Sequence, residues 1–243
     1  MLKKVIVLCS VILIASCDVA NEVLTQLETV AMTPQSNQLT NDEVVGGLKE
    51  ALTQGIEKAV DLTSITDGFN NNLEIKLPFP EDALKIKEKA LEFGLDKQVA
   101  DFELNLNRAA ESASKMALPI FKDAILNMSI QDGFQILKGG KGAATSFLKN
   151  STSKQLYDAF LPKVKDAIDQ VKLTSYWNPI VTKYNGVMKL TGGQQLNPDL
   201  NDYVTQKAIS GLFIMVEKEE NNIRQNPTAR VTDLLKKVFG YNE

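Results

Sequence analysis

Apolar residues recur along most of the chain at the three- and four-residue spacing that is typical of amphipathic helices. The first such stretch, from about residue 42 to residue 62, predicts a helix with one apolar face made of Val45, Leu48, Leu52, Ile56, Ala59 and Val60. The second stretch, from about residue 96 to residue 128, predicts a helical region with an apolar face made of Val99, Phe102, Leu106, Ala110, Ala113 and Ala117. We expect an interruption near Pro119 because proline cannot donate a backbone hydrogen bond.

The rest of the chain continues the helical pattern in shorter segments. Ser129 with Asp132 three residues later is typical of a capping box, and Gly139–Gly140 marks the end of that helix. The nearly apolar run 208–216 predicts a helix buried in the core, because no face of it is polar. Further helices are expected at about 80–93, 142–149, 151–172 with a break near Pro162, 174–185, from Pro198 through the apolar run, and 227–239.

One short segment breaks this pattern. Residues 73–77 alternate apolar and polar side chains as a strand would, but five residues cannot form a sheet alone. The sequence therefore predicts an all-α fold: a single multi-helix, bundle-like domain with at most a minor short strand near 73–77.

The N-terminus is typical of a secreted lipoprotein. Two lysines precede the apolar run 5–16, whose length of about 18 Å as a helix is too short for a membrane span of about 30 Å. The sequence Ile14-Ala15-Ser16-Cys17 resembles the lipobox of bacterial lipoproteins, in which the cysteine receives a diacylglyceryl group before cleavage. We expect a signal peptide at 1–16, lipidation of Cys17, a lipidated tether at 17–41 and a helical domain at 42–243.

Composition excludes several kinds of chemistry. The chain contains no histidine, and its other cysteine, Cys9, lies in the predicted signal peptide, so histidine-based catalysis, histidine-ligated zinc and thiol catalysis are not expected of the mature domain. The formal net charge is −3, and removal of the two N-terminal lysines leaves −5, which argues against nucleic acid as a partner. No catalytic residue, metal ligand or cofactor site is predicted.

Two concentrations of polar residues are candidates for ligand binding. The first comprises Glu103, Asn107, Arg108 and Glu111, and the helical pattern places Glu103 and Asn107 along the border of the apolar face. Arg108 and Glu111 are three residues apart and can form an ion pair. A structural role in helix packing is the alternative interpretation of this group.

The second candidate group follows the predicted central helix. Glu217, Glu220 and Arg224 lie near one helical face, which suggests either a buried glutamate–arginine network or a carboxylate pair at the mouth of a cavity. The simpler alternative is a helix that leaves the core and enters solvent.

Several short motifs between residues 77 and 240 are similar to those of one protein family. They are Leu77–Pro80, Asn107–Glu111, Ile136–Gly140, Asp202–Thr205, Gly211–Phe213 and Thr232–Gly240. Over roughly residues 43–240 the sequence resembles the bacterial envelope proteins grouped as domain of unknown function family 4197. The resemblance implies a helical domain behind a secretion signal, and it supplies no activity and no site residues.

These observations favour a lipid-anchored protein of the bacterial cell envelope with its domain outside the cytoplasm. The expected function is non-enzymatic binding of an apolar ligand or of an envelope protein. One alternative is a hydrolase that attacks an envelope polymer through paired carboxylates drawn from Glu103, Glu111, Glu217 and Glu220. Another is a purely structural spacer without a cavity.

Overall fold

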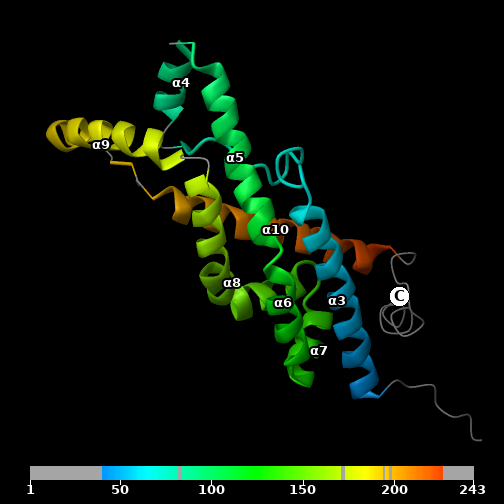
Figure 1. The fold of residues 1–243 in the computed structure, drawn as a ribbon. Helices are drawn as coiled ribbons and strands as arrows, with labels where there is room; N and C mark the ends of the chain where they lie inside the picture. Colours follow the sequence, from blue (N-terminus) through cyan, green and yellow to red (C-terminus); the bar gives the residue numbers. More distant parts are fainter. Residues whose placement is uncertain are drawn as a thin grey trace, which may run out of the picture. The chain divides into compact units, whose positions relative to one another are not determined.

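A computed structural model describes residues 40–81, 84–92, 94–170, 173–193, 195–196 and 199–226. Figure 1 shows that the secondary structure of these residues is helical and that α10 crosses several other helices. In chain order the helices are α3 (Asn41–Ser64), α4 (Leu84–Glu92), α5 (Asp96–Ser114), α6 (Ala117–Leu126), α7 (Ile130–Lys138), α8 (Ala143–Gln170), α9 (Leu173–Thr191) and α10 (Leu200–Gln225). The all-α, single-domain prediction is confirmed.

Helices α3 and α5 bury the faces that the sequence pattern predicted. Every residue assigned to the two apolar faces is buried. Helix α3 begins at Asn41, one residue earlier than expected, because the side chain of Thr40 accepts the Glu43 N–H and the Glu43 carboxylate accepts the Thr40 N–H in return. Helix α5 ends at Ser114 and α6 begins at Ala117, so the predicted interruption lies just before Pro119.

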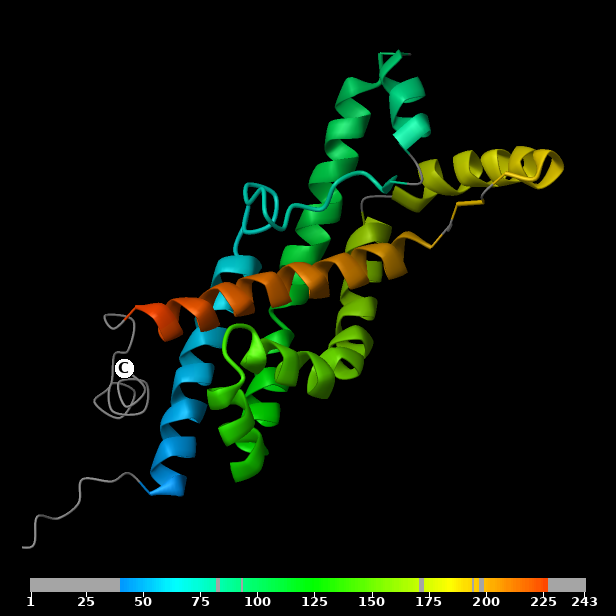
Figure 2. The same cartoon turned by 180° about the vertical axis from the view of Figure 1, so that it is seen from behind.

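Helix α10 organises the core. It packs against α8, α3 and α5, and Figure 2 shows it crossing these helices when the molecule is viewed from behind. Helix α10 approaches α3 closely at Gly55. A Cβ added to Gly55 would lie 3.4 Å from the side chain of Ile223. The predicted apolar run is buried except at Ile214 and Ser210.

The predicted strand at 73–77 is absent from the described structure. Residues 73–75 form a turn, the Lys76 N–H donates to the Asn72 carbonyl at 2.8 Å, and residues 76–77 belong to no helix or strand. Ile75 and Leu77 are buried, whereas Leu73 is 91% exposed, so the alternating pattern places two apolar side chains in the core without a sheet. The backbone of Leu77 is paired instead with the side chain of Asn107.

Helix α8 also differs from the prediction, because it is continuous where two helices and a break near Pro162 were expected. Ser151, Thr152 and Ser153 donate their hydroxyls to carbonyls four residues earlier, which lets these polar residues remain within the helix. Both views show α8 changing direction along its length, as helices with proline or with such hydroxyl bonds commonly do (Figures 1 and 2).

The remaining helix predictions are confirmed in part. Helix α9 extends the predicted segment 174–185 at both ends, and α10 begins at Leu200 after its N-cap Asp199. Pro198 and the helix expected at 227–239 lie outside the described residues, as do the signal peptide and all but the last two residues of the tether.

Candidate functional site

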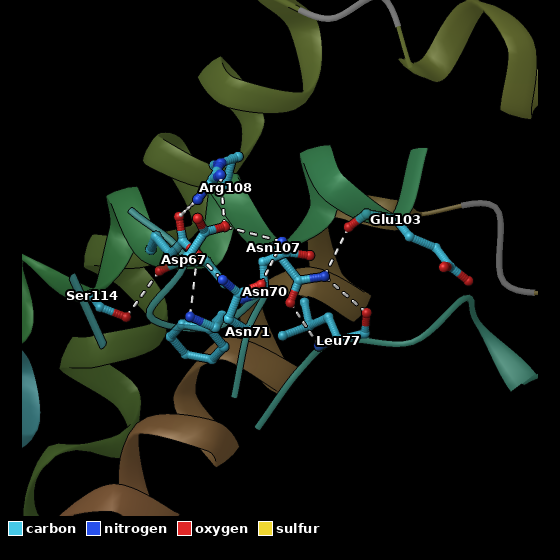
Figure 3. A network of polar contacts seen from close by, with 11 residues as sticks. Asp67, Asn70, Asn71, Leu77, Glu103, Asn107, Arg108 and Ser114 are labelled. Carbon is cyan, nitrogen blue, oxygen red and sulfur yellow. Dashed lines mark hydrogen bonds and ion pairs between the residues drawn. The ribbon is translucent and has the colours of Figure 1, made fainter. Parts of the chain in front are cut away.

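The first candidate group lies where α5 meets the segment that follows α3. Figure 3 shows Asn107, Arg108 and Glu103 on α5 beside the loop that carries Asp67, Asn70 and Leu77. The loop lies thirty to forty-two residues before its partners in the chain. The contacts across this junction determine what the predicted residues can do.

Asn107 is fully buried and not at the border of the helix face, where the sequence pattern placed it. Its Oδ1 accepts the Leu77 N–H at 2.8 Å, and its Nδ2 donates to the Leu77 carbonyl at 3.0 Å. The same Nδ2 donates to the Glu103 carbonyl at 2.8 Å. A buried side chain with both amide groups paired to backbone in this way is unavailable to a ligand.

Glu103 lies closer to the surface than Asn107. Its carboxylate forms an ion pair with Lys87 of α4, and both side chains are about one quarter exposed. The ammonium group of Lys87 also lies 5.9 Å from the centre of the Phe79 ring. The Phe79 ring packs against the Phe102 ring, with 4.6 Å between the two ring centres. Glu103 therefore links α4 to α5.

Glu111 is 4% exposed, and both of its oxygens are engaged. Oε1 accepts the backbone N–H groups of Phe69 at 3.1 Å and Asn70 at 3.2 Å, and Oε2 accepts from Arg108 at 2.7 Å. The predicted pairing of Arg108 with Glu111 is confirmed. Burial of a carboxylate is tolerated here because a guanidinium and two backbone donors replace its hydration.

Arg108 connects this carboxylate to a tight turn in the loop. Its Nη2 donates to Asp67 Oδ1 at 2.8 Å, and Asp67 adopts a positive φ of 68°. The pKa of Asp67 is lowered, first by the hydrogen bond from Asn70 and then by Arg108. The pKa of Arg108 is raised, mainly by its hydrogen bond with Glu111. The group thus fastens the loop to α5.

The second candidate group is built around Glu220 on α10. Glu220 is 6% exposed and accepts two backbone N–H groups in the first turn of α8, from Ala144 at 3.1 Å and Thr145 at 2.9 Å, together with the Thr145 hydroxyl at 2.8 Å. A carboxylate at a helix N-terminus satisfies free N–H groups and interacts favourably with the helix dipole. Glu220 therefore caps α8 from another helix.

Arg224 completes this arrangement. Its Nε donates to Glu220 Oε1 at 2.9 Å, and its Nη2 donates to the Ile136 carbonyl in α7 at 2.8 Å. The predicted glutamate–arginine network exists, and it joins α7, α8 and α10. Glu217 is exposed and lies beside Gly142, where an added Cβ would be 3.4 Å from its Oε1.

The structure does not combine the seven predicted residues into one cleft. Asn107, Arg108 and Glu111 attach the loop to α5, whereas Glu220 and Arg224 connect three other elements. Their oxygens and nitrogens bind backbone groups that would otherwise be buried without partners. The contacts of the first group are those expected from its alternative interpretation, a structural role in helix packing, and ligand binding by either group stays a prediction.

A pocket that sequence reasoning missed lies between α7 and α8. It has a volume of about 440 Å³ and is lined by Asp132, Gln135, Ile136, Ala143, Phe147, Asn150 and Ser151. The lining residues follow the spacing of one face on each helix, so two helix faces form its walls. In the sequence, only this spacing points to the pocket. The spacing does not indicate that these faces of α7 and α8 oppose each other.

Among the described residues, no group of three or more histidine, cysteine, aspartate or glutamate side chains is arranged to hold a metal ion. Within the same residues, no helix is both long and apolar enough to cross a membrane. Cys17, the predicted lipidation site, lies outside the described residues.

The fold and these contacts define a single-domain, all-α protein whose buried ion pairs fasten its loops and helix ends. The family model for a protein of unknown function (DUF4197) matches residues 38–240, and the chain belongs to that family. No curated protein and no solved structure matches the chain.

Proposed function

We propose that the protein is a non-enzymatic binding protein, anchored to a membrane of the bacterial envelope through lipid on Cys17, and that the pocket between α7 and α8 is its binding site. The pocket is the observation on which this proposal rests. Gln135 and Asn150 line it, and within the described residues neither side chain has a hydrogen-bond partner. Its volume of about 440 Å³ is in the range of small-molecule sites.

The hydrogen bonds of the two buried glutamates support a binding function over hydrolysis. A hydrolase of the predicted kind needs one carboxyl group that can donate a proton and a second that can attack or activate water. Both oxygens of Glu111 and of Glu220 instead accept hydrogen bonds from backbone N–H groups, arginine or a hydroxyl, so no carboxylate oxygen of either residue is left to attack or to activate water. No contact of Glu103 or Glu217 favours the hydrolase alternative.

Attachment to the envelope is supported by the N-terminal sequence. The basic start, apolar run and small residues before Cys17 match the organisation of a lipoprotein precursor. Several acyl chains on one residue are sufficient for lasting attachment, since each buried methylene contributes about 0.8 kcal/mol.

Native mass spectrometry of the full-length protein released from its own membrane tests both parts. We expect a mass that begins at lipidated Cys17, with a bound small molecule that disappears in the double variant Gln135→Ala/Asn150→Ala. The matched control is Gln155→Ala, an exposed residue of α8 outside the pocket lining. A protein that retains residues 1–16 and carries no lipid would contradict the anchor, and a protein without a bound molecule would contradict the binding function.

A further inference from the structure

The chemistry of the pocket lining restricts what it can bind. Each wall is one helix face: Asp132, Gln135 and Ile136 lie at positions i, i+3 and i+4 of α7. On α8, Phe147, Asn150 and Ser151 have the same spacing. Asp132 and Phe147 are half-buried and Gln135, Asn150 and Ser151 are exposed, so the two helices fix the backbone positions from which these side chains can reach a ligand.

The polar atoms of the lining divide into acceptors and donors. One oxygen of Asp132 is occupied by the N–H and hydroxyl of Ser129 at 3.0 and 2.6 Å, and the structure shows no partner for the other oxygen within the described residues. The Ser151 hydroxyl donates to the Phe147 carbonyl, so it offers its lone pairs to a ligand. The amides of Gln135 and Asn150 each offer one acceptor oxygen and two donor hydrogens.

The charges at the pocket argue against anionic ligands. No lysine or arginine is among its lining residues, and the single charged group, Asp132, is an anion. An anionic ligand would therefore be repelled without compensation. A cationic ligand could use Asp132 and the amide oxygens but would leave the amide hydrogens of Gln135 and Asn150 unused, whereas a hydroxyl group can accept from them as well.

We infer that the pocket between α7 and α8 binds a neutral saccharide. A hydroxyl group donates one hydrogen bond and accepts others, so adjacent sugar hydroxyls match a lining of two amides, one carboxylate oxygen and one serine oxygen. The half-buried ring of Phe147, with Ile136 and Ala143, supplies an apolar wall for the C–H face of a sugar ring. This inference rests on the proposed binding function and names its ligand class.

A short peptide is the competing ligand class, because its backbone also donates and accepts. Peptide grooves usually add a row of apolar anchor pockets or an exposed strand edge. The apolar part of this lining is limited to Ile136, Ala143 and Phe147, and the described structure contains no strand. The lining therefore favours the saccharide.

The test is calorimetric titration of the full chain in detergent with three neutral probes, namely maltotetraose, cellotetraose and tetra-N-acetylchitotetraose. A charged tetragalacturonate and trialanine serve as comparison ligands. We expect saturable binding of at least one neutral probe and no binding of tetragalacturonate. Gln135→Ala and Asn150→Ala should each weaken that binding about fivefold to tenfold, as expected for a lost hydrogen bond, and Gln155→Ala should leave it unchanged.

The outcomes separate this inference from the proposed function. Binding of trialanine or tetragalacturonate in place of the neutral probes would overturn the saccharide inference. So would failure of all three probes when native mass spectrometry shows a bound molecule that depends on Gln135 and Asn150, although the binding function would then stand. Neutral-probe binding that is equally strong in both pocket variants would overturn the site.

Discussion

The side chain of Asn107 is bonded to both backbone polar groups of Leu77, with its Oδ1 accepting the N–H at 2.8 Å and its Nδ2 donating to the carbonyl at 3.0 Å. This is the pairing that a neighbouring strand would provide. It lets Leu77 lie buried in the core without a sheet, because the amide supplies the hydrogen bonds that a neighbouring strand would give.

Removal of this amide should destabilise the domain. In Asn107→Leu the Leu77 N–H and carbonyl become buried without partners, and we expect the free energy of unfolding to fall by about 2–4 kcal/mol. Urea denaturation measures this change. Asn105→Leu on the same helix is the control, since the structure shows no hydrogen bond from Asn105 among the described residues, and an equal loss in both variants would contradict the role of Asn107.

The cap that Glu220 provides for α8 should also be measurable. Glu220→Ala leaves the buried N–H groups of Ala144 and Thr145 without their acceptor and removes the ion pair with Arg224, and breaking such a buried ion pair costs about 3–5 kcal/mol. Faster hydrogen exchange of the Ala144 and Thr145 amides should accompany this loss. Glu217→Ala, at an exposed position of the same helix, should change stability by no more than about 0.5 kcal/mol. Unchanged exchange at both amides in Glu220→Ala would refute the cap.

Two glycines should respond to alanine in opposite directions. A Cβ at Gly211 would lie 2.7 Å from the ring of Phe69, which is fully buried, so Gly211→Ala should destabilise the domain by about 1–3 kcal/mol. Gly46 is exposed on α3 with nothing within 4 Å of an added Cβ, so Gly46→Ala should stabilise it by up to about 1 kcal/mol. Thermal unfolding of the two variants distinguishes these expectations, and a loss of stability in Gly46→Ala would contradict the second.

The pH dependence of stability should reflect Asp67. The folded protein holds the pKa of this carboxyl below its usual value of 3.8, so the unfolded chain binds a proton first as the pH falls. The contribution of Asp67 is therefore complete at neutral pH and is lost progressively below about pH 5. Asp67→Asn should show a shallower fall in Tm between neutral and acidic pH than the unmodified protein. Asparagine also tolerates the positive φ at this position, so identical slopes would contradict the role of the carboxylate.

The periodic part of the sequence predicted most of the fold. The buried faces of α3 and α5 and the capping box between Ser129 and Asp132 follow from local spacing, and all three are present. The family resemblance is confirmed as well. Local patterns suffice here because helix formation and end capping depend on residues that are close in the chain.

The contacts between distant segments could not be predicted in this way. Nothing near Asn107 in the sequence indicates that it bonds to a residue thirty positions earlier, and Glu220 caps a helix that begins more than seventy residues before it. The pocket depends in addition on which faces of α7 and α8 oppose each other. The continuity of α8 through Ser151–Ser153 and Pro162 was missed because packing outweighs weak local helix preference.

The position of α10 in the chain has a consequence for how the domain is completed. This helix covers α3, α5 and α8, yet it is not finished until residue 225. A chain shortened before Leu200 would leave the apolar sides of three earlier helices uncovered and the buried N–H groups of Ala144 and Thr145 without their carboxylate. During synthesis the domain therefore lacks its main stabilising partner until residues 200–225 have been translated.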